Sequence, residues 1–233
     1  MSIILGIHDG HTATACLTKD GEIVAMVSEE RFNRVKNWGG TPTVSAKWCL
    51  EHAGIKPSQL DTIAVPGLVN PLTTVEHGDQ FPPGPVARWS HLIPQSLLAS
   101  DLVLGLYLSL LKPRRDFSGV RELMQEWQLP AEKLQVHEHH LCHAGSAYHL
   151  SGLASDAEDT LVFTLDGSGD GLSGTVSVAR GAKIERKLAL SSYHSLGLIY
   201  SLLTRYLGMK ALEHEYKVMG LAPYAPEKLA AKA

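Results

Sequence analysis

Residues 2–28, SIILGIHDGHTATACLTKDGEIVAMVS, decide the fold of this chain. The apolar run at 2–7 is typical of a buried strand, and a turn-forming cluster at 8–12 separates it from a second strand at 13–18. Asp20-Gly21 is the strongest short-range signal for a tight hairpin, with 22–28 as the returning strand. The glycine and hydroxyl residues of the first turn would let backbone amides approach a phosphate closely.

Helix and strand patterns alternate after this opening. Thr41-Pro42-Thr43 predicts the start of a helix that runs to about residue 52 and ends at Gly54. Residues 60–65 then predict a strand of the parallel type, which Pro66-Gly67 terminates. A helix between strands indicates an α/β fold.

The middle of the chain is expected to be an insertion. Residues 68–95 are rich in Pro, Gly and His and predict a long irregular loop, a kind of segment that often carries function. Residues 96–111 predict a buried or half-buried helix rather than a membrane span. A second amphipathic helix is expected at 118–128, and Arg114 and Arg115 before it are expected to form a solvated basic turn.

Histidines are concentrated between residues 137 and 149, where a short strand at 134–136 leads into a helix from His139 onward. His139 and His143 are four residues apart and therefore project from one helix face, as two nitrogen ligands for a divalent metal would. The alternative is a run of helix-surface and capping histidines. Because a pair supplies only two ligands, a metal site here needs a further group, for which a carboxylate is the best candidate.

A candidate for that carboxylate is Asp166, which follows a predicted buried strand at 160–165 and opens the glycine-rich sequence DGSGDG. A carboxylate held by a strand, next to glycines that permit close backbone approach, suits metal or phosphate chemistry. The alternative is an ordinary hairpin turn with Asp166 as its Asx residue. The order of strands and turns from 161 to 190 also repeats that of 4–28, which indicates a duplicated fold with a site in the cleft between the copies.

Composition excludes several classes of protein. The net charge of −3 and a pI near 6.4 give no reason to expect polyanion binding. The three cysteines are widely spaced and form no CxxC, which fits a reduced cytoplasmic protein without a thiolate zinc site. The start of the chain lacks the pattern of a signal peptide.

Five motifs in order resemble the N-terminal part of the carbamoyltransferases of the NodU/CmcH type, which O-carbamoylate nodulation factors and antibiotics. They are LGI with HTATA (5–7, 11–15), SEERFNRVK (28–36), EHHLCHAGSAY (138–148), LDGSGD (165–170) and EYKVMGLAPY (215–224). The resemblance implies a duplicated actin-like ATPase (ribonuclease-H-like) domain with its first half complete and its second half truncated. Residues 1–159 would form the first subdomain, with an insertion at about 68–128, and 160–233 the start of the second.

The resemblance also implies the chemistry. Carbamoyl phosphate and ATP would give carbamoyl adenylate in a separate domain resembling the YrdC family, and the carbamoyl group would then pass to a hydroxyl of a small-molecule acceptor. The family's metal ligands, for which iron is expected, fall on His139, His143 and Asp166. His11 would orient or deprotonate the acceptor hydroxyl, and Lys36 would pair with a phosphate or the carbamoyl oxygen. The residues implied for nucleotide or substrate binding are Gly167, Gly169, Lys217 and Gly220.

Two positions depart from the family pattern, and the chain is short for it. Thr12 stands where many relatives have Asp, so no role is carried over there, and Cys142 stands where Ala is common and is expected to be a packed thiol. The family's fourth metal ligand and adenylate-forming domain are expected outside residues 1–233. The chain is therefore expected to be a fragment that needs a missing C-terminal region or a separate adenylate-forming partner, with no nucleic-acid or membrane partner.

Three alternatives remain open at this point. One is a tRNA threonylcarbamoyltransferase-like enzyme, although that substrate would favour a basic surface. Another is a different nucleotide-binding protein of the actin fold, such as a kinase or an Hsp70-like ATPase. The third is a catalytically inactive truncated remnant that acts as an interaction module through the helix at 96–111. No motif identifies the acceptor.

Overall fold

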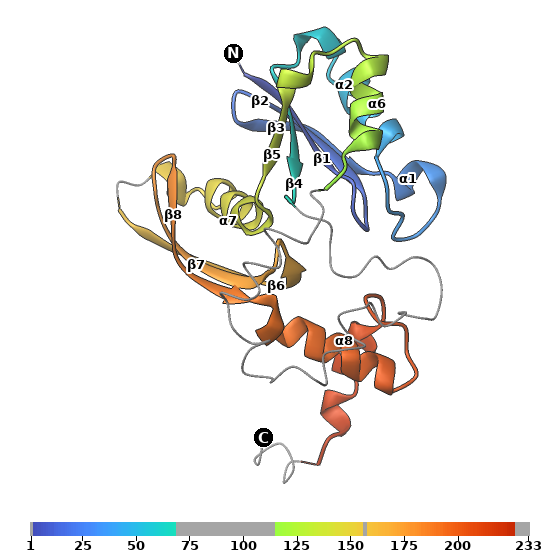
Figure 1. The fold of residues 1–233 in the computed structure, drawn as a ribbon, viewed down its shortest axis with the longest axis vertical. Coiled ribbons are helices and arrows are strands. Elements are labelled where there is room, and N and C mark those ends of the chain that lie inside the picture. Colours follow the sequence, from blue (N-terminus) through green and yellow to red (C-terminus); the bar gives the residue numbers. More distant parts are fainter. Residues whose placement is uncertain (1, 69–114, 156–157, 227–233) are drawn as a thin grey trace. The chain divides into compact units, whose positions relative to one another are not determined.

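Figure 1 shows the computed structural model of the chain, which describes residues 2–68, 115–155 and 158–226. These residues divide into two compact units. The first contains the described residues up to 68 together with 115–146, and the second contains those from 147 onward. The loop and helix expected between 69 and 111 lie outside the described residues, and so does Arg114.

The first unit is built on a five-stranded sheet in the order β3-β2-β1-β4-β5. Its first three strands are antiparallel, and β4 and β5 run parallel to β1 on the other side. This is the ribonuclease-H-like arrangement that the sequence predicts. The strands are β1 (Ile3–His8), β2 (Thr14–Lys19), β3 (Glu22–Ser28), β4 (Thr62–Pro66) and β5 (Leu134–His137).

The predicted hairpin between β2 and β3 is confirmed. Asp20 and Gly21 have φ of 51° and 90°, the left-handed values that a type I′ turn needs at both central positions. Lys19 pairs with Glu22 across the turn, which fixes the register of the two strands.

Alternation of buried residues along the strands creates the core of the first unit. Ile3, Leu5 and Ile7 of β1 are at most 3% exposed and belong to one cluster with buried side chains of α2 (Thr43–His52) and α6 (Ser118–Glu126). Each such aliphatic side chain contributes roughly 1.5–3 kcal/mol when buried. The sheet is thereby fixed to the two helices, which lie beside it in Figure 1.

The remaining described elements before β6 are three short ones and one long helix. The short ones are α1 (Glu30–Asn33) and the 3-10 turns Pro57–Gln59 and Ala131–Lys133, and the long helix is α7 (His139–Leu150), which follows β5 directly. A further 3-10 turn, Leu153–Ser155, follows α7.

The second unit contains a three-stranded antiparallel sheet in the order β6-β7-β8. The predicted repeat of strands and turns is present, and two helices and two short turns come after it. Its hairpin turn, Asp170-Gly171, again has positive φ at both positions, 50° and 85°. The elements are β6 (Thr160–Gly169), β7 (Leu172–Arg180), β8 (Lys183–Ser191), the 3-10 turn Ser192–His194, α8 (Leu196–Tyr206), α9 (Glu215–Met219) and the 3-10 turn Ala222–Tyr224.

One face of this second sheet is apolar and exposed. Leu161, Phe163 and Leu165 of β6 are 56%, 66% and 70% exposed, whereas the alternating Val162 and Thr164 are buried. Large exposed apolar patches are uncommon on soluble proteins and mark surfaces that contact something else. Leu188 and Leu190 of β8 extend the same face across the sheet, because they pair through Val176 and Gly174 with Phe163 and Leu165.

Among the helices that the structure describes, none is long and apolar enough to cross a membrane.

Candidate functional site

The start of helix α7 is fixed by Glu138, the residue between β5 and the helix. Its carbonyl oxygen accepts a hydrogen bond from the Cys142 amide at 3.1 Å, and its carboxylate accepts from the amides of His140 and Leu141 at 3.0 and 2.8 Å. The carboxylate satisfies amides that the helix itself leaves unpaired and lies at the positive end of the helix dipole. The strand therefore passes directly into a well-capped helix.

This capped start presents His139 and His143 on one helix face, as the spacing predicts. Their Nε2 atoms lie 2.9 Å apart, with ring centroids separated by 4.6 Å and ring planes at 74°. At this separation the two nitrogens can share one proton or bind one cation. His140, next to His139 in the sequence, is fully buried.

Asp166 belongs to β6 in the second unit. The predicted strand end at residue 165 is wrong, because β6 continues to Gly169 through an irregularity in its pairing with β7 between Leu165 and Gly169. Such irregularities redirect side chains and recur next to active sites. The hairpin turn is Asp170-Gly171, so Asp166 lies within the strand and not in the turn.

The backbone around Asp166 is packed against the first turn of α8. A Cβ atom built on Gly197 would lie 2.9 Å from the Cα of Gly167, so the close approach requires glycine at 197. The Ser195 hydroxyl donates to the Asp166 carbonyl at 3.4 Å and accepts from the Leu198 amide at 3.1 Å as the helix N-cap. The Asp166 carboxylate accepts from the Gly167 amide at 2.6 Å.

His11 lies in the turn after β1, where both it and Thr12 are exposed. Its carbonyl oxygen lies 3.0 Å from His8 Nε2 and accepts from the Thr12 hydroxyl at 2.5 Å. Thr12 adopts a left-handed φ of 58°, a conformation that is uncommon for a β-branched residue. Thr14 donates to the Thr12 carbonyl at 2.8 Å, and its hydroxyl lies 2.9 Å from that of Ser28 at the end of β3. The turn is thus held in an unusual conformation by hydroxyl contacts.

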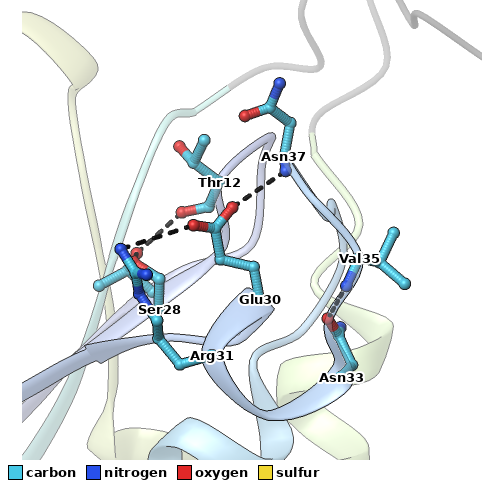
Figure 2. Close-up of polar contacts among 8 residues, drawn as sticks. Thr12, Ser28, Glu30, Arg31, Asn33, Val35 and Asn37 are labelled. Carbon is cyan, nitrogen blue, oxygen red and sulfur yellow. Dashed lines mark hydrogen bonds and ion pairs between the residues drawn. The ribbon is translucent and has the colours of Figure 1, made fainter.

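The segment that carries Lys36 folds around Glu30, as Figure 2 shows. The Glu30 carboxylate accepts from the Asn37 amide at 3.0 Å, and the Asn33 side chain accepts from the Val35 amide at 2.8 Å. Arg34 and Asn37 have φ of 60° and 55° on either side of Lys36. These contacts order a loop with the Lys36 side chain exposed on it.

The His11 turn and the Lys36 loop are hydrogen-bonded to each other within the first unit. The Ala13 amide donates to the Trp38 carbonyl at 2.9 Å, and the Gly40 amide donates to the Asp9 carbonyl at 3.1 Å. The structure therefore brings these two predicted site segments together.

Glu29 is a residue that sequence reasoning missed. Its side chain is buried, and its carboxylate accepts from the amides of Val44 and Ser45 at 3.1 and 2.7 Å at the start of α2. The first Glu of the SEERFNRVK motif is thus a helix cap supplied from outside the helix.

The remaining predicted residues lie in the second unit. Lys217 is exposed on α9, with its ammonium 5.8 Å from the centroid of the Tyr216 ring. Gly220 ends this helix and donates its amide to the Tyr216 carbonyl at 3.1 Å. Gly167 and Gly169 lie in the last part of β6.

An open pocket of about 240 Å³ lies in the first unit at the carboxyl ends of β1, β4 and β5. Ligands of open α/β sheets commonly bind at these strand ends. The pocket lies beside two predicted segments, because His8 precedes the His11 turn and Cys142 neighbours His143. It is lined by Gly6, Ile7, His8, Thr14, Cys16, Ala64, Val65, Pro66, His137 and Cys142.

The expectation of a solvated basic turn is wrong for Arg115. Its guanidinium pairs with the Asp9 carboxylate, and the two side chains are only 14% and 12% exposed. Asp9 is 106 residues away in the sequence, so no local pattern could have identified it as the partner.

The strand order of the first sheet defines an α/β protein of the ribonuclease-H-like class. Within that class, the family model described as "Carbamoyltransferase N-terminus" matches residues 3–231. The chain belongs to this family.

Relatives support the assignment. The nodulation protein NolNO of Sinorhizobium fredii is 34% identical over 220 residues, which cover 94% of this chain and 28% of the relative. An uncharacterized protein of Synechocystis is 33% identical over 235 residues, which cover 98% of this chain and 35% of the relative. The nodulation protein NolO of Bradyrhizobium diazoefficiens is 48% identical over 86 residues, which cover 37% of this chain and 15% of the relative. The chain spans about a third of the length of the curated relatives that match most of it.

Solved structures show more distant likeness. A putative N-acetylmannosamine kinase from Listeria monocytogenes matches with a TM-score of 0.43 and 12% identity, covering 97% of this chain and 72% of the other. YeaZ from Pseudomonas aeruginosa matches with a TM-score of 0.37 and 14% identity, covering 82% of this chain and 68% of the other. At these scores the fold assignment rests on the strand order and the family.

Proposed function

We propose that the protein to which this chain belongs is an O-carbamoyltransferase, which moves a carbamoyl group from carbamoyl adenylate to a hydroxyl of a small-molecule acceptor. The observation that carries the proposal is the pair of imidazole nitrogens 2.9 Å apart on α7, in a chain of the carbamoyltransferase family. A kinase or chaperone-like ATPase has no use for that pair. Carbamoyl phosphate and ATP are the substrates from which the adenylate would be made.

We assign a divalent metal to His139, His143 and Asp166. Two imidazole nitrogens and one carboxylate oxygen are a donor set that suits a divalent metal. The Nε2 atoms of the two histidines, 2.9 Å apart on one helix, could both bind one metal ion.

Iron is the metal proposed here, since two histidines and one carboxylate are a common ligand set of non-haem Fe(II). When bound, the metal would act as a Lewis acid toward phosphate oxygens of the adenylate. The Glu138 cap orients the first turn of α7 and so positions His139.

His11 and Lys36 are the residues proposed to act on the reacting groups. His11 would accept the proton of the acceptor hydroxyl, a task suited to an imidazole near neutral pH. The Lys36 ammonium would neutralise a phosphate or carbamoyl oxygen. The hydrogen bonds between their two segments support a joint role, because they hold the backbone of one against the other.

Nucleotide binding is assigned to the second unit. Gly167 has open space where a Cβ would lie, so a ligand can approach its backbone closely. The exposed ammonium of Lys217 is available to a phosphate, and Gly220 follows it at the end of α9. Gly169 completes the proposed set.

We propose that residues 1–159 and 160–233 correspond to the two actin-like subdomains of the family. The adenylate would be supplied by a further region of the protein or by a separate adenylate-forming partner. The setting proposed is the cytoplasm, in keeping with three free cysteines among the described residues.

A ligand titration tests the function. The purified chain is titrated with a stable carbamoyl-adenylate analogue by calorimetry, with and without Fe(II). The proposal expects binding that Fe(II) strengthens and that Lys217→Ala weakens, while Lys183→Ala on the exposed hairpin between β7 and β8 leaves it unchanged. A complete absence of binding, both with and without Fe(II), would contradict the proposal.

A further inference from the structure

Arg115 makes two side-chain contacts in different directions. Its Nη2 atom pairs with the Asp9 carboxylate, and its Nη1 atom donates to the Pro66 carbonyl at 2.8 Å. Both charged side chains are nearly excluded from water, at 14% and 12% exposed. Surface ion pairs contribute little, but a pair this enclosed is costly to break on one side only, because the other charge is left uncompensated.

These contacts connect the ends of two neighbouring strands. Asp9 directly follows β1, and Pro66 is the last residue of β4, which runs parallel to β1. The Arg115 amide also donates to the Leu68 carbonyl at 3.2 Å, and its guanidinium lies 5.3 Å from the ring centroid of the buried Phe117. Arg115 is therefore itself held in place by backbone and by core.

On its other side, Asp9 belongs to the turn that carries His11. The Asp9 carbonyl accepts from the Gly40 amide, so the same residue connects Arg115 to the loop after Lys36. The backbone between Asp9 and His11 has little conformational freedom. A Cβ atom built on Gly10 would lie 2.8 Å from the His8 ring, and His8 Nε2 lies 3.0 Å from the His11 carbonyl oxygen.

We propose that Arg115 is a positioning residue, which through Asp9 sets the backbone of the turn that presents His11. The inference rests on the proposed role of His11 for its functional meaning. Arginine suits this position because its planar fork donates in two fixed directions, toward a carboxylate and toward a carbonyl, as a lysine ammonium does not.

Amide hydrogen exchange on the purified chain tests the positioning. In Arg115→Gln and in Asp9→Asn, the Gly40 and Ala13 amides should exchange at least roughly tenfold faster than in the parent, while those within β1 and β2 keep their rates. The ring signal of His11 should shift in the NMR spectra of both variants. Lys47→Gln, which removes an exposed ion pair of α2 with Glu126, is the matched control. It should change neither the exchange rates of the Gly40 and Ala13 amides nor the His11 ring signal.

Two further variants separate positioning from general destabilisation. Arg115→Lys keeps a charge near Asp9 but loses the second donor, so its exchange rates should lie between those of the parent and Arg115→Gln. The double variant Asp9→Asn/Arg115→Gln should match Arg115→Gln and not exceed it, because Arg115→Gln already removes the ion pair with Asp9 together with the Pro66 contact. An unchanged His11 signal with unchanged Gly40 exchange overturns the proposal, and so does a uniform rise in exchange over the whole sheet.

Titration with the stable carbamoyl-adenylate analogue, followed at the His11 ring signal, connects the inference to function. The parent should respond, and Arg115→Gln should need at least roughly tenfold more ligand for the same response. A parent that does not respond contradicts the role of His11, whereas exchange rates that do not change contradict positioning. The two failures are therefore distinguishable.

Discussion

The Nε2 atoms of His139 and His143 lie 2.9 Å apart, one helical turn from each other on α7. Two neutral imidazoles would meet at this distance only by sharing a proton in a hydrogen bond, whereas a metal ion brings two nitrogens this close by binding both. The pair is held by a helix whose start is capped by Glu138.

Replacing Glu29 should destabilise the first unit. Its buried carboxylate accepts from two amides of α2, and Glu29→Ala leaves both donors without that partner. The expected loss is about 1–3 kcal/mol of unfolding free energy, measured by urea denaturation. Glu51→Ala near the exposed end of the same helix is the control and should change stability by less than about 0.5 kcal/mol.

Cys49 should be the slowest cysteine to react. Burial raises the pKa of its thiol to about 11 from an ordinary value of 9.0, so its thiolate at pH 8 is about a hundredfold scarcer than that of an unperturbed cysteine. Its alkylation rate should keep rising with pH up to about 11. Mass spectrometry of iodoacetamide-treated chain checks this, and a Cys49 that reacts as fast in the folded chain as in urea would contradict the burial.

Acid should weaken the fold through His8. Burial lowers the pKa of this imidazole below its ordinary 6.5, so the folded chain favours the neutral form. The stabilising contribution is complete above pH 6.5 and is lost as pH falls through the lowered pKa. His8→Gln should therefore show a smaller loss of stability than the parent between pH 7.5 and pH 5. Equal slopes in urea denaturation would contradict this prediction.

The apolar face of β6 should make the chain self-associate as its concentration rises. Leu161, Phe163 and Leu165 expose more than half of their side-chain surfaces on one sheet face. Phe163→Lys should reduce both the association measured by light scattering and the binding of a hydrophobic dye. Ile23→Lys, on an edge strand of the first sheet with lower exposure, is the comparison and should have the smaller effect. Equal scattering by parent and Phe163→Lys would exclude this face as the contact.

Local signals in the sequence predicted much of the fold. Asp20-Gly21 identified the first hairpin because its turn needs two residues with positive φ. The i, i+4 spacing of His139 and His143 predicted a shared helix face, since α-helical periodicity is fixed by the backbone. The extension of β6 beyond Leu165 was missed because an irregular strand contains glycines that otherwise indicate a turn.

Long-range contacts were not predictable in the same way. Arg115 and Asp9 look like ordinary surface charges in isolation, and only the adjacency of β1 and β4 brings them together. Glu29 likewise caps a helix that begins fourteen residues further along the chain. Both contacts require tertiary structure before either partner can be recognised.

Fe(II) binding by the purified chain under anaerobic conditions tests the proposed metal site. Saturable binding is expected in the parent and in His149→Ala, the matched control on the exposed end of the same helix. His139→Ala, His143→Ala and Asp166→Ala should each weaken binding by at least roughly 100-fold, since each removes a direct ligand. Equal iron affinity in the parent and the three ligand variants would contradict the metal site.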